Sequence, residues 1–172
     1  AWTLRPAVSI RQDKWESKRG KMRSTCLHCH SPGWTDNFFQ QFDAAVDLWN
    51  EKFAQPAGTI MAKLRKAGKL APPQFDENIE WVYFLLWHHE GRRARHGAAM
   101  MGPDYTQWHG FFEVAHRFYM EFLPEAEHLL PGVTARVRKE DSHQWLEGMP
   151  KELRKKIESF YEERYTGKGA HK

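Results

Sequence analysis

Hydrophobic residues recur at helical spacing along most of the chain, and the first long stretch begins after residue 34. Apolar positions three and four residues apart predict an amphipathic helix that Thr35 or Asp36 caps and Gly68 ends. These positions are Phe38, Phe39, Phe42, Val46, Trp49, Phe53, Ile60, Met61 and Leu64. Because proline lacks the N–H that an interior helical turn needs, we expect a kink near Pro56.

A second helical stretch follows the turn signal Pro72-Pro73. Asp76 is the expected N-cap, and the helix leads into His88-His89-Glu90. Its apolar residues are Ile79, Trp81, Val82, Phe84, Leu85, Leu86 and Trp87. They occupy nearly all sides of a helix, so we expect burial on most sides. The helix continues through residues 91–97 only if packing offsets the cost of the two glycines there.

The third stretch begins after Met101-Gly102 interrupts the pattern. Pro103 suits the first turn of a helix that continues to Pro124 or beyond. Its apolar positions are Trp108, Phe111, Phe112, Val114, Ala115, Phe118, Tyr119 and Phe122. No segment alternates as a strand does, so the sequence predicts an all-α protein of long helices without internal repeats.

The segments outside these helices are polar and less regular. We expect residues 1–24 to form an extended segment and Ser31-Pro32-Gly33 to interrupt regular structure after His30. We expect residues 131–144 to form a polar connection and Pro150 to open a charged helix that ends near Tyr165. The sequence thus divides into a helical region, residues 1–130, and a tail, residues 131–172.

Composition narrows the class of protein. A chain of 172 residues with 41% hydrophobic residues suits one compact domain and excludes a disordered, collagen-like or disulfide-stapled protein. Eight Trp, eleven Phe and five Tyr are many for this length and suggest the lining of a large flat group. The net charge of +4 does not require nucleic acid but permits an acidic protein partner.

The ends and apolar runs carry little targeting information. No apolar run reaches the length that spans a bilayer, and residues 1–20 lack the apolar core of a secretory signal. The chain opens on Ala1 without a preceding Met, as a mature protein or a piece of a longer one does.

Both cysteines belong to one motif, Cys26-Leu27-His28-Cys29-His30. This C-x-x-C-H order is typical of c-type haem attachment. The two thiols add to the two vinyl groups of a porphyrin, and the following histidine is the proximal ligand of the iron. The motif therefore predicts covalent haem c on Cys26, Cys29 and His30. Since such haems are attached outside the cytoplasm in bacteria, we expect a periplasmic or otherwise exported protein.

Three other interpretations of the cysteines are open. A thioredoxin-like redox pair would need an α/β pattern around it, which the sequence lacks. Half of a zinc site would need further ligands at short spacing, and no other cysteine is present. A local disulfide is the third.

Ten histidines are a surplus for one haem motif. Six of them lie on or just after the second and third helices: His88, His89, His96, His109, His116 and His128. On helical spacing His89 pairs with His96 and His109 with His116. We favour His88 or His89 as the distal ligand of this haem. An imidazole on so apolar a helix needs a bond or a ligand.

Methionine and arginine residues offer further candidates. Met61, Met100 or Met101 would serve as the sixth ligand in a small electron-transfer cytochrome, although methionines at such positions also fill cores. Arg92, Arg93 and Arg95 either balance haem propionates or form a solvated basic face.

The run from Trp87 to Gly110, with its His-His-Glu-Gly-Arg-Arg and Met-Met-Gly-Pro-Asp-Tyr sequences, resembles the C-terminal region of octahaem hydroxylamine oxidoreductases. The resemblance extends from Lys21-Met22-Arg23 and the haem motif, through Trp49-Asn50-Glu51-Lys52, to residues 122–127. It covers about residues 1–130, and no motif is recognisable in the tail.

The resemblance implies a multihaem cytochrome c that oxidises hydroxylamine, or hydrazine in related dehydrogenases. Subunits of that family form trimers, pass electrons to a soluble cytochrome, and crosslink a tyrosine to the catalytic haem of a neighbouring subunit. Tyr105 matches that catalytic tyrosine, and its presence favours the oxidative members. Without the resemblance, Tyr105 would be an ordinary first-turn residue packed in a core.

The chain departs from the family because it holds one haem motif where the family has eight. It therefore matches the C-terminal portion of such an enzyme, or a subunit of a split one, which alone lacks the active site. The resemblance implies that its haem is an electron-transfer haem with two histidine ligands. It also implies that some helical histidines, such as His88 or His89, ligate neighbouring haems bound by the missing part. A single-haem electron carrier and a non-catalytic assembly subunit are the alternatives, and the substrate and product are open.

Overall fold

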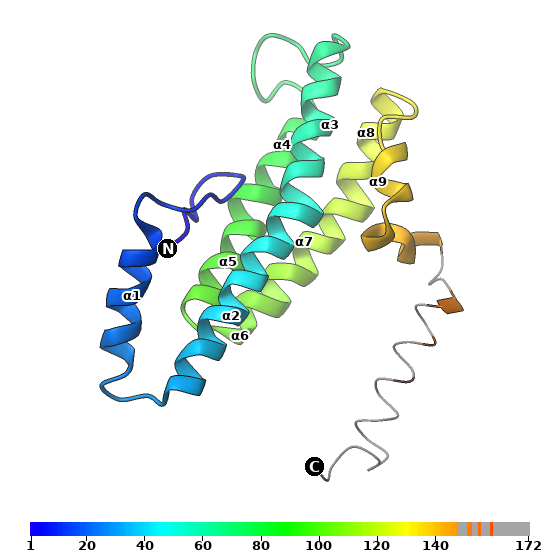
Figure 1. Ribbon diagram of the computed structural model, residues 1–172. Coiled ribbons are helices and arrows are strands. Elements are labelled where there is room, and N and C mark those ends of the chain that lie inside the picture. The colour runs from blue at the N-terminus through cyan, green and yellow to red at the C-terminus, as the bar shows by residue number, and fades with distance from the viewer. Residues whose placement is uncertain (148–150, 153–154, 156–158, 160–172) are drawn as a thin grey trace. The chain divides into compact units, whose positions relative to one another are not determined.

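The computed structural model describes residues 1–147, 151, 152, 155 and 159, and most of them are helical (Figure 1). The chain forms two compact units, Ala1–Thr134 and Ala135–Lys172. Among the described residues the only extended pairing is an isolated antiparallel bridge between Trp2 and Arg11. The expected all-α class is therefore confirmed.

The first unit is built from a short helix and three long ones. The short helix is α1 (Trp15–Cys26). The first long helix joins α2 (Pro32–Leu48), the π-helical segment η1 (Trp49–Ala54) and α3 (Gln55–Lys66). The second joins α4 (Asn78–Leu85), the π-helical η2 (Leu86–Glu90) and α5 (Gly91–Ala99). The third joins α6 (Pro103–Thr106), η3 (Gln107–Phe112), α7 (Glu113–His116), η4 (Arg117–Phe122) and α8 (Leu123–Leu129), of which η3 and η4 are π-helical.

The helix boundaries differ from the expected ones at three places. Residues 15–26 form α1 rather than an extended lead-in. The first long helix begins at Pro32, because the Ser31 hydroxyl accepts a hydrogen bond from the Trp34 amide, so neither Thr35 nor Asp36 is its cap. The second begins at Asn78, with Glu77 rather than Asp76 at the N-cap.

Pro56 does not break the first long helix. The helix changes to π-helical geometry over η1, just before the proline, and continues to Lys66. It ends at Gly68, as expected, where the left-handed φ of 66° suits a residue without Cβ.

The two glycines of the second long helix lie where neighbouring segments approach closely. A Cβ on Gly91 would overlap the indole ring of Trp49, and one on Gly97 would lie 2.7 Å from the backbone of Tyr105 and Thr106. The helix therefore runs through residues 91–97, because close packing offsets the cost of glycine.

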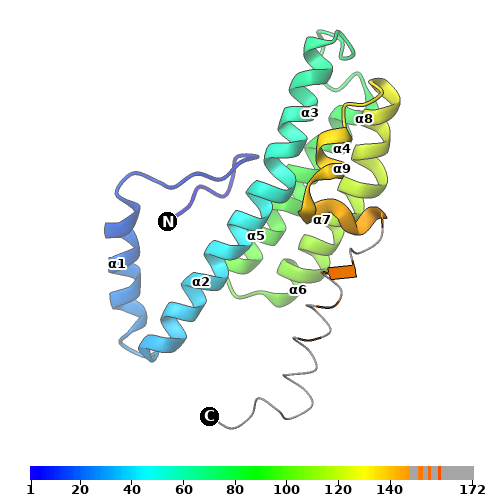
Figure 2. The same cartoon turned by 45° about the vertical axis from the view of Figure 1, so that its right-hand side comes forward.

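The three long helices lie side by side and successive ones run antiparallel (Figures 1 and 2). Contacts join α2 to α5, α4 to η4 and α3 to α8. The core between them includes Trp49, Phe53, Leu64, Ile79, Leu86, Val114, Phe118 and Phe122. Burial of these apolar side chains is the main term that stabilises the unit.

The second long helix is not buried on most sides, contrary to the sequence expectation. Only Ile79, Val82 and Leu86 of its apolar run are buried, whereas Trp81 is 50% exposed. Phe84 and Trp87 are partly exposed. The helix thus carries an aromatic face that the rest of the first unit leaves open.

The segment before α1 is fixed to the long helices by buried polar contacts. The Asn50 amide exchanges two hydrogen bonds of 2.8 Å with the backbone of Ser9. The Trp49 indole N–H donates to the carbonyl of Ala7, and the Arg95 guanidinium donates to Pro6 O and Ser9 Oγ. We call this set, residues 6–9 with Trp49, Asn50 and Arg95, the N-terminal clamp.

The second unit contains α9 (Ala135–Lys139) and a 3-10 helix, η5 (Asp141–Glu147). The expected polar connection at residues 131–144 is therefore partly helical. The helix expected from Pro150 to Tyr165 lies outside the described residues, apart from isolated positions. No helix in the part of the chain that the structure describes combines the length and apolarity needed to cross a membrane.

Candidate functional site

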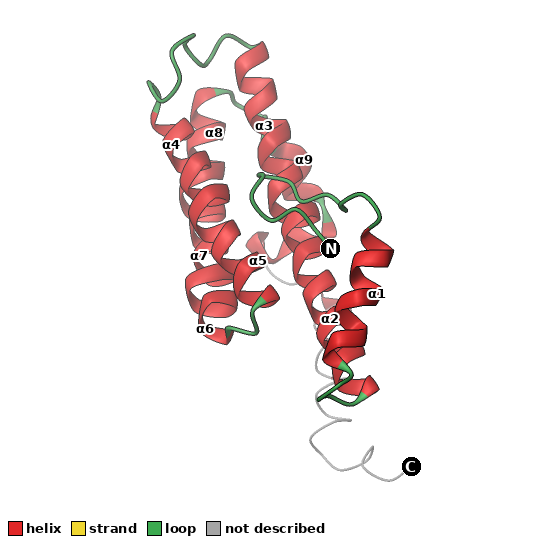
Figure 3. Ribbon diagram, turned by 90° about the vertical axis from the view of Figure 1, so that its left-hand side faces the viewer, coloured by secondary structure: helices red, strands yellow, loops and turns green. Residues whose placement is uncertain are grey.

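The C-x-x-C-H motif forms a tight turn at the tip between α1 and α2, which projects at one end of the first unit (Figure 3). Cys26 ends α1, and its carbonyl accepts hydrogen bonds from the amides of Cys29, at 3.1 Å, and His30, at 2.9 Å. These bonds fold the motif back on itself within one turn. All three residues of the motif that carry chemistry, Cys26, Cys29 and His30, therefore belong to one turn of the backbone.

The side chains of the motif are accessible. Neither cysteine forms a disulfide; Cys26 is partly exposed and Cys29 is exposed. His30 is exposed, and no hydrogen bond fixes its ring within the described residues. The local disulfide considered above is absent from this structure.

Two contacts hold the tip in place beyond the turn itself. The Arg23 guanidinium donates to both carboxylate oxygens of Asp36, at 2.7 and 3.0 Å, and so ties α1 to α2. The imidazole of His30 stacks on the indole of Trp34, with centroids 3.8 Å apart and planes 13° from parallel. The tip is thus organised by contacts between residues close in the sequence.

The residues of the tip fit haem c. Two free thiols at the required spacing, an unbonded histidine that directly follows the second one, and an adjacent aromatic face are the groups that this cofactor uses. A zinc ion fits less well. No group of three or more His, Cys, Asp or Glu side chains suited to a metal ion occurs among the residues that the structure describes.

His88 and His89 lie far from this tip. Trp49 packs on Gly91, one turn after the histidines, and Trp49 is 19 residues along the helix from His30. At about 1.5 Å per residue this places both histidines roughly 28 Å or more from His30. Neither can be the distal ligand of a haem on His30 in the same chain, which leaves ligation of a neighbouring haem as the open role.

The environment of His88 suits a neutral imidazole. Its ring stacks on Phe84 at 4.4 Å, and its buried Nδ1 has no hydrogen-bond partner. Burial lowers the pKa of His88 from its ordinary value, and Arg92 and His89 lower it further by repulsion. Neutral imidazole is the form that ligates a metal.

The methionine candidates differ in exposure. Met61 is buried in the core, where it fills space, whereas Met100 and Met101 are 80% and 55% exposed. Met101 lines an apolar groove of about 610 Å³ between α2 and the α5–α6 bend. Phe38, Phe42 and Phe111 line the same groove.

The three arginines have separate partners and form no common face. Arg95 is fully buried in the clamp, and burial lowers its pKa to about 10. Arg93 pairs with Glu113 at 2.7 Å, and Arg92 donates to the carbonyl of Arg5 at 2.8 Å. Arg95 is therefore no part of a solvated basic face.

Tyr105 presents its side chain outward from a fixed backbone. It is 56% exposed in the first turn after the α5–α6 bend, and its ring lies 6.1 Å from that of His109. Its backbone packs so closely on Gly97 that a Cβ there would lie 2.7 Å from the carbonyl carbon of Tyr105. Tyr105 is thus an accessible phenol, not a core residue.

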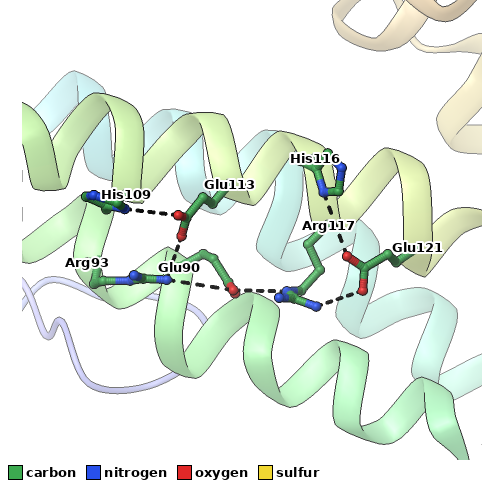
Figure 4. Close-up of polar contacts among 7 residues, drawn as sticks. All are labelled: Glu90, Arg93, His109, Glu113, His116, Arg117 and Glu121. Carbon is green, nitrogen blue, oxygen red and sulfur yellow. Dashed lines mark hydrogen bonds and ion pairs between the residues drawn. The ribbon is translucent and has the colours of Figure 1, made fainter.

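An extended polar network joins the second and third long helices (Figure 4). The buried Glu90 accepts from Arg117 at 3.0 Å and lies 3.8 Å from Arg93. Glu113 and Glu121 continue the network outward to His109 and His116, which lie 3.0 and 3.7 Å from these carboxylates. His109 and His116 therefore have carboxylate partners and lie at the solvent-facing edge of the helix pair.

Large apolar side chains form a stripe along the third long helix. Tyr105, Trp108, Phe112 and Met120 are 56–67% exposed and follow one another at spacings of three, four and eight residues. Helical geometry places such positions on one face. Exposed apolar stripes often occur where a protein contacts another protein or a ligand, so this face is a candidate interface.

Several residues at or near the site were not singled out from the sequence. Trp34 lies just before the start expected for the first long helix. Glu90 lies in the His88-His89-Glu90 stretch into which the second helix was expected to lead. A signal for Trp34 is its spacing of four from His30, which places the rings on one helical face once the helix begins at Pro32. Glu90 gives no such signal, because its partner Arg117 lies 27 residues away.

Comparison with known proteins adds no relative. No family model, no curated protein and no solved structure matches the chain.

Proposed function

We propose that this chain carries haem c on Cys26, Cys29 and His30 and is the C-terminal portion, or a split subunit, of a multihaem oxidoreductase. The enzyme oxidises hydroxylamine or hydrazine in an exported compartment and passes the electrons to a soluble cytochrome. The observation that supports the proposal is the backbone turn of the Cys26–His30 motif, which presents two free thiols and an exposed imidazole at the spacing that haem c uses.

The residues of this chain provide attachment and orientation. The haem supplies one-electron chemistry at its iron when bound. Cys26 and Cys29 would hold the porphyrin covalently, and His30 would ligate its iron. Because these side chains are at least partly exposed, a haem held there would be accessible to neighbouring redox centres.

Tyr105 is the residue of this chain that we assign to the catalytic centre of a neighbouring subunit. Support comes from its exposure and from the close packing of its backbone on Gly97. A phenol that reaches another subunit must stand clear of its own core, and Tyr105 does. In this role Tyr105 would lie against the catalytic haem of that subunit, to which the resemblance implies a crosslink.

The surface of the first unit favours an assembled enzyme over a free-standing carrier. The stripe of Tyr105, Trp108, Phe112 and Met120 and the exposed Trp81 would face water in a monomeric cytochrome. In a trimer or with the rest of a multihaem enzyme, these side chains are buried against partners. His88 and His89 then face haems that other parts of the enzyme bind.

Mass spectrometry of the natively purified protein tests the proposal. We expect haem on the peptide that contains Cys26–His30, and a second adduct in which Tyr105 is joined to a haem whose cysteines belong to another peptide. The double variant C26S/C29S is the control, because it must lose the first adduct without losing either His30 or Tyr105.

The outcomes separate the parts of the proposal. A wild-type chain without haem on Cys26 and Cys29 would contradict haem attachment. Haem on this peptide with an unmodified Tyr105 would retain electron transfer and contradict the crosslinked oxidase, in favour of a reductive or structural relative.

A further inference from the structure

The imidazole of His30 is held by one aromatic contact. Its ring and the indole of Trp34 are stacked, with centroids 3.8 Å apart and planes 13° from parallel. Within the described residues no hydrogen bond reaches either ring nitrogen of His30. A metal-bound histidine commonly has its second nitrogen bonded to a carboxylate or carbonyl, which fixes the rotation of the ring. Here the stack takes the place of that bond.

Trp34 is itself well anchored. Its amide donates to the Ser31 hydroxyl at 3.3 Å, which starts α2 immediately before it. Its ring also continues into a ladder along one face of α2, with centroid separations of 6.2 Å to Phe38 and 6.3 Å from Phe38 to Phe42. The planes of successive rings differ by only 13–14°.

The far end of this ladder is rigid. Phe42 is buried, and both Phe38 and Phe42 pack along the groove between α2 and the α5–α6 bend. The orientation of the His30 ring is therefore set through Trp34 by the packed part of the helix. The backbone turn of residues 26–30 fixes the position of His30, whereas the stack on Trp34 fixes the plane of its imidazole ring.

We propose that Trp34 is a positioning residue for the proximal ligand, which sets the orientation of the His30 imidazole on the iron and thereby tunes the haem potential. The proposal rests on the proposed function, since it requires haem on Cys26 and Cys29. Axial-ligand orientation is one means by which a protein tunes such a cofactor. Trp34 touches the ligand and not the substrate.

The test compares W34L, W34F and W87L in the haem-loaded full chain. Leucine removes the stacked ring, phenylalanine retains a smaller one, and W87L repeats the tryptophan-to-leucine change next to His88, which lies far from the tip. Readouts are haem content by mass, the electron paramagnetic resonance spectrum of the ferric iron, and the midpoint potential.

We expect W34L to keep its covalent haem and to shift the midpoint potential. In the electron paramagnetic resonance spectrum, the fraction of ferric haem in species other than the main one should rise about 2- to 10-fold, as expected for the loss of one aromatic pair. W34F should lie between W34L and wild type, and W87L should match wild type in all three readouts.

The outcomes distinguish this proposal from the function on which it rests. An unloaded wild-type chain contradicts the proposed function. A loaded W34L chain with unchanged spectrum and potential overturns the role of Trp34 alone. If W34L is not loaded, W34F decides: an altered spectrum and potential supports the proposal, and wild-type values overturn it.

Discussion

Trp34 and Trp49 lie on the same continuous helix, yet they belong to regions held together in different ways. Trp34 is 39% exposed and contacts rings four residues away on either side, His30 and Phe38. Trp49 is fully buried, donates to Ala7 from 42 residues away, and packs on Gly91 and beneath the Arg95 guanidinium.

The difference shows which region of this chain is held by contacts between segments distant in the sequence. The clamp around Trp49 joins three segments distant in the sequence through buried hydrogen bonds, so its loss affects the whole unit. The tip around Trp34 is organised locally, and α1 has no buried residue. A tip of this kind keeps thiols and imidazole accessible, and the ring ladder from Trp34 to Phe42 links it to the packed part of α2.

The largest effect on stability should follow from W49A. Removal of a fully buried indole leaves a cavity and an unpaired carbonyl at Ala7, so we expect a loss of about 3–5 kcal/mol in the free energy of unfolding. Denaturant titration followed by circular dichroism measures it. W34A is the matched control, with an expected loss below about 1 kcal/mol, and equal losses in the two variants would contradict the comparison.

The buried cation of the clamp should give the next largest effect. R95M keeps a long apolar side chain but leaves Pro6 O and Ser9 Oγ without their donor, so we expect a loss of about 2–3 kcal/mol. R92M removes the neighbouring, half-exposed guanidinium and should cost under about 1 kcal/mol. An R95M variant with an unchanged free energy of unfolding would show that the clamp does not need the charge.

Asp43 links the two regions and predicts a pH dependence. Burial acts to raise its pKa, but hydrogen bonds from Arg19, Arg11 and Trp2 outweigh it and hold the pKa well below 3.8. The stabilisation by the carboxylate is therefore complete above pH 3.8 and is lost as the pH falls through the lowered value of the folded state. D43N should cost about 1–2 kcal/mol at pH 7.

The pH dependence itself is the sharper test. Free energies of unfolding at several pH values between 7 and 2 should show the gap between wild type and D43N closing only at acid pH. D13N, at an exposed position on the preceding segment, is the control. A gap that stays constant down to pH 2 would mean that the charge of Asp43 is not the source of its effect.

The smallest effect on stability should come from the cysteines. In haem-free chains, C26S/C29S should change the free energy of unfolding by less than about 0.5 kcal/mol, since both side chains are at least partly exposed and unpaired. The same variant should lose all covalently bound haem, as judged by haem staining of a denaturing gel. A C26S/C29S chain that fails to fold would refute the local character of the tip.

Periodicity located the three long helices, and residue type located the motif. A helix is indicated by the spacing of apolar residues such as Phe42, Val46 and Trp49, and the C-x-x-C-H motif is defined by the types of its residues. The boundaries were less predictable. Thr35 and Asp36 both look like caps, but the Ser31 hydroxyl bonds the Trp34 amide first, and α1 formed where no apolar period indicated it.

Burial was the least predictable property, because it depends on which face meets a partner. Trp81 and Ile79 belong to the same apolar run, but only Ile79 faces the core. Arg95 is one of three arginines within residues 92–95, and its complete burial depends on Pro6 and Ser9, nearly 90 residues away. Such pairings have no local signature.

The sequence by itself determined the all-α class, the three long helices and the motif that predicts haem attachment, because helical period and motif spacing are local properties of the chain. Tertiary structure alone decided that His88 and His89 stand far from His30, that Tyr105 points outward, and that Trp34 rather than a hydrogen bond holds the imidazole of His30. These facts depend on how distant segments pack and where the first helix begins, and neither is written in the spacing of residues.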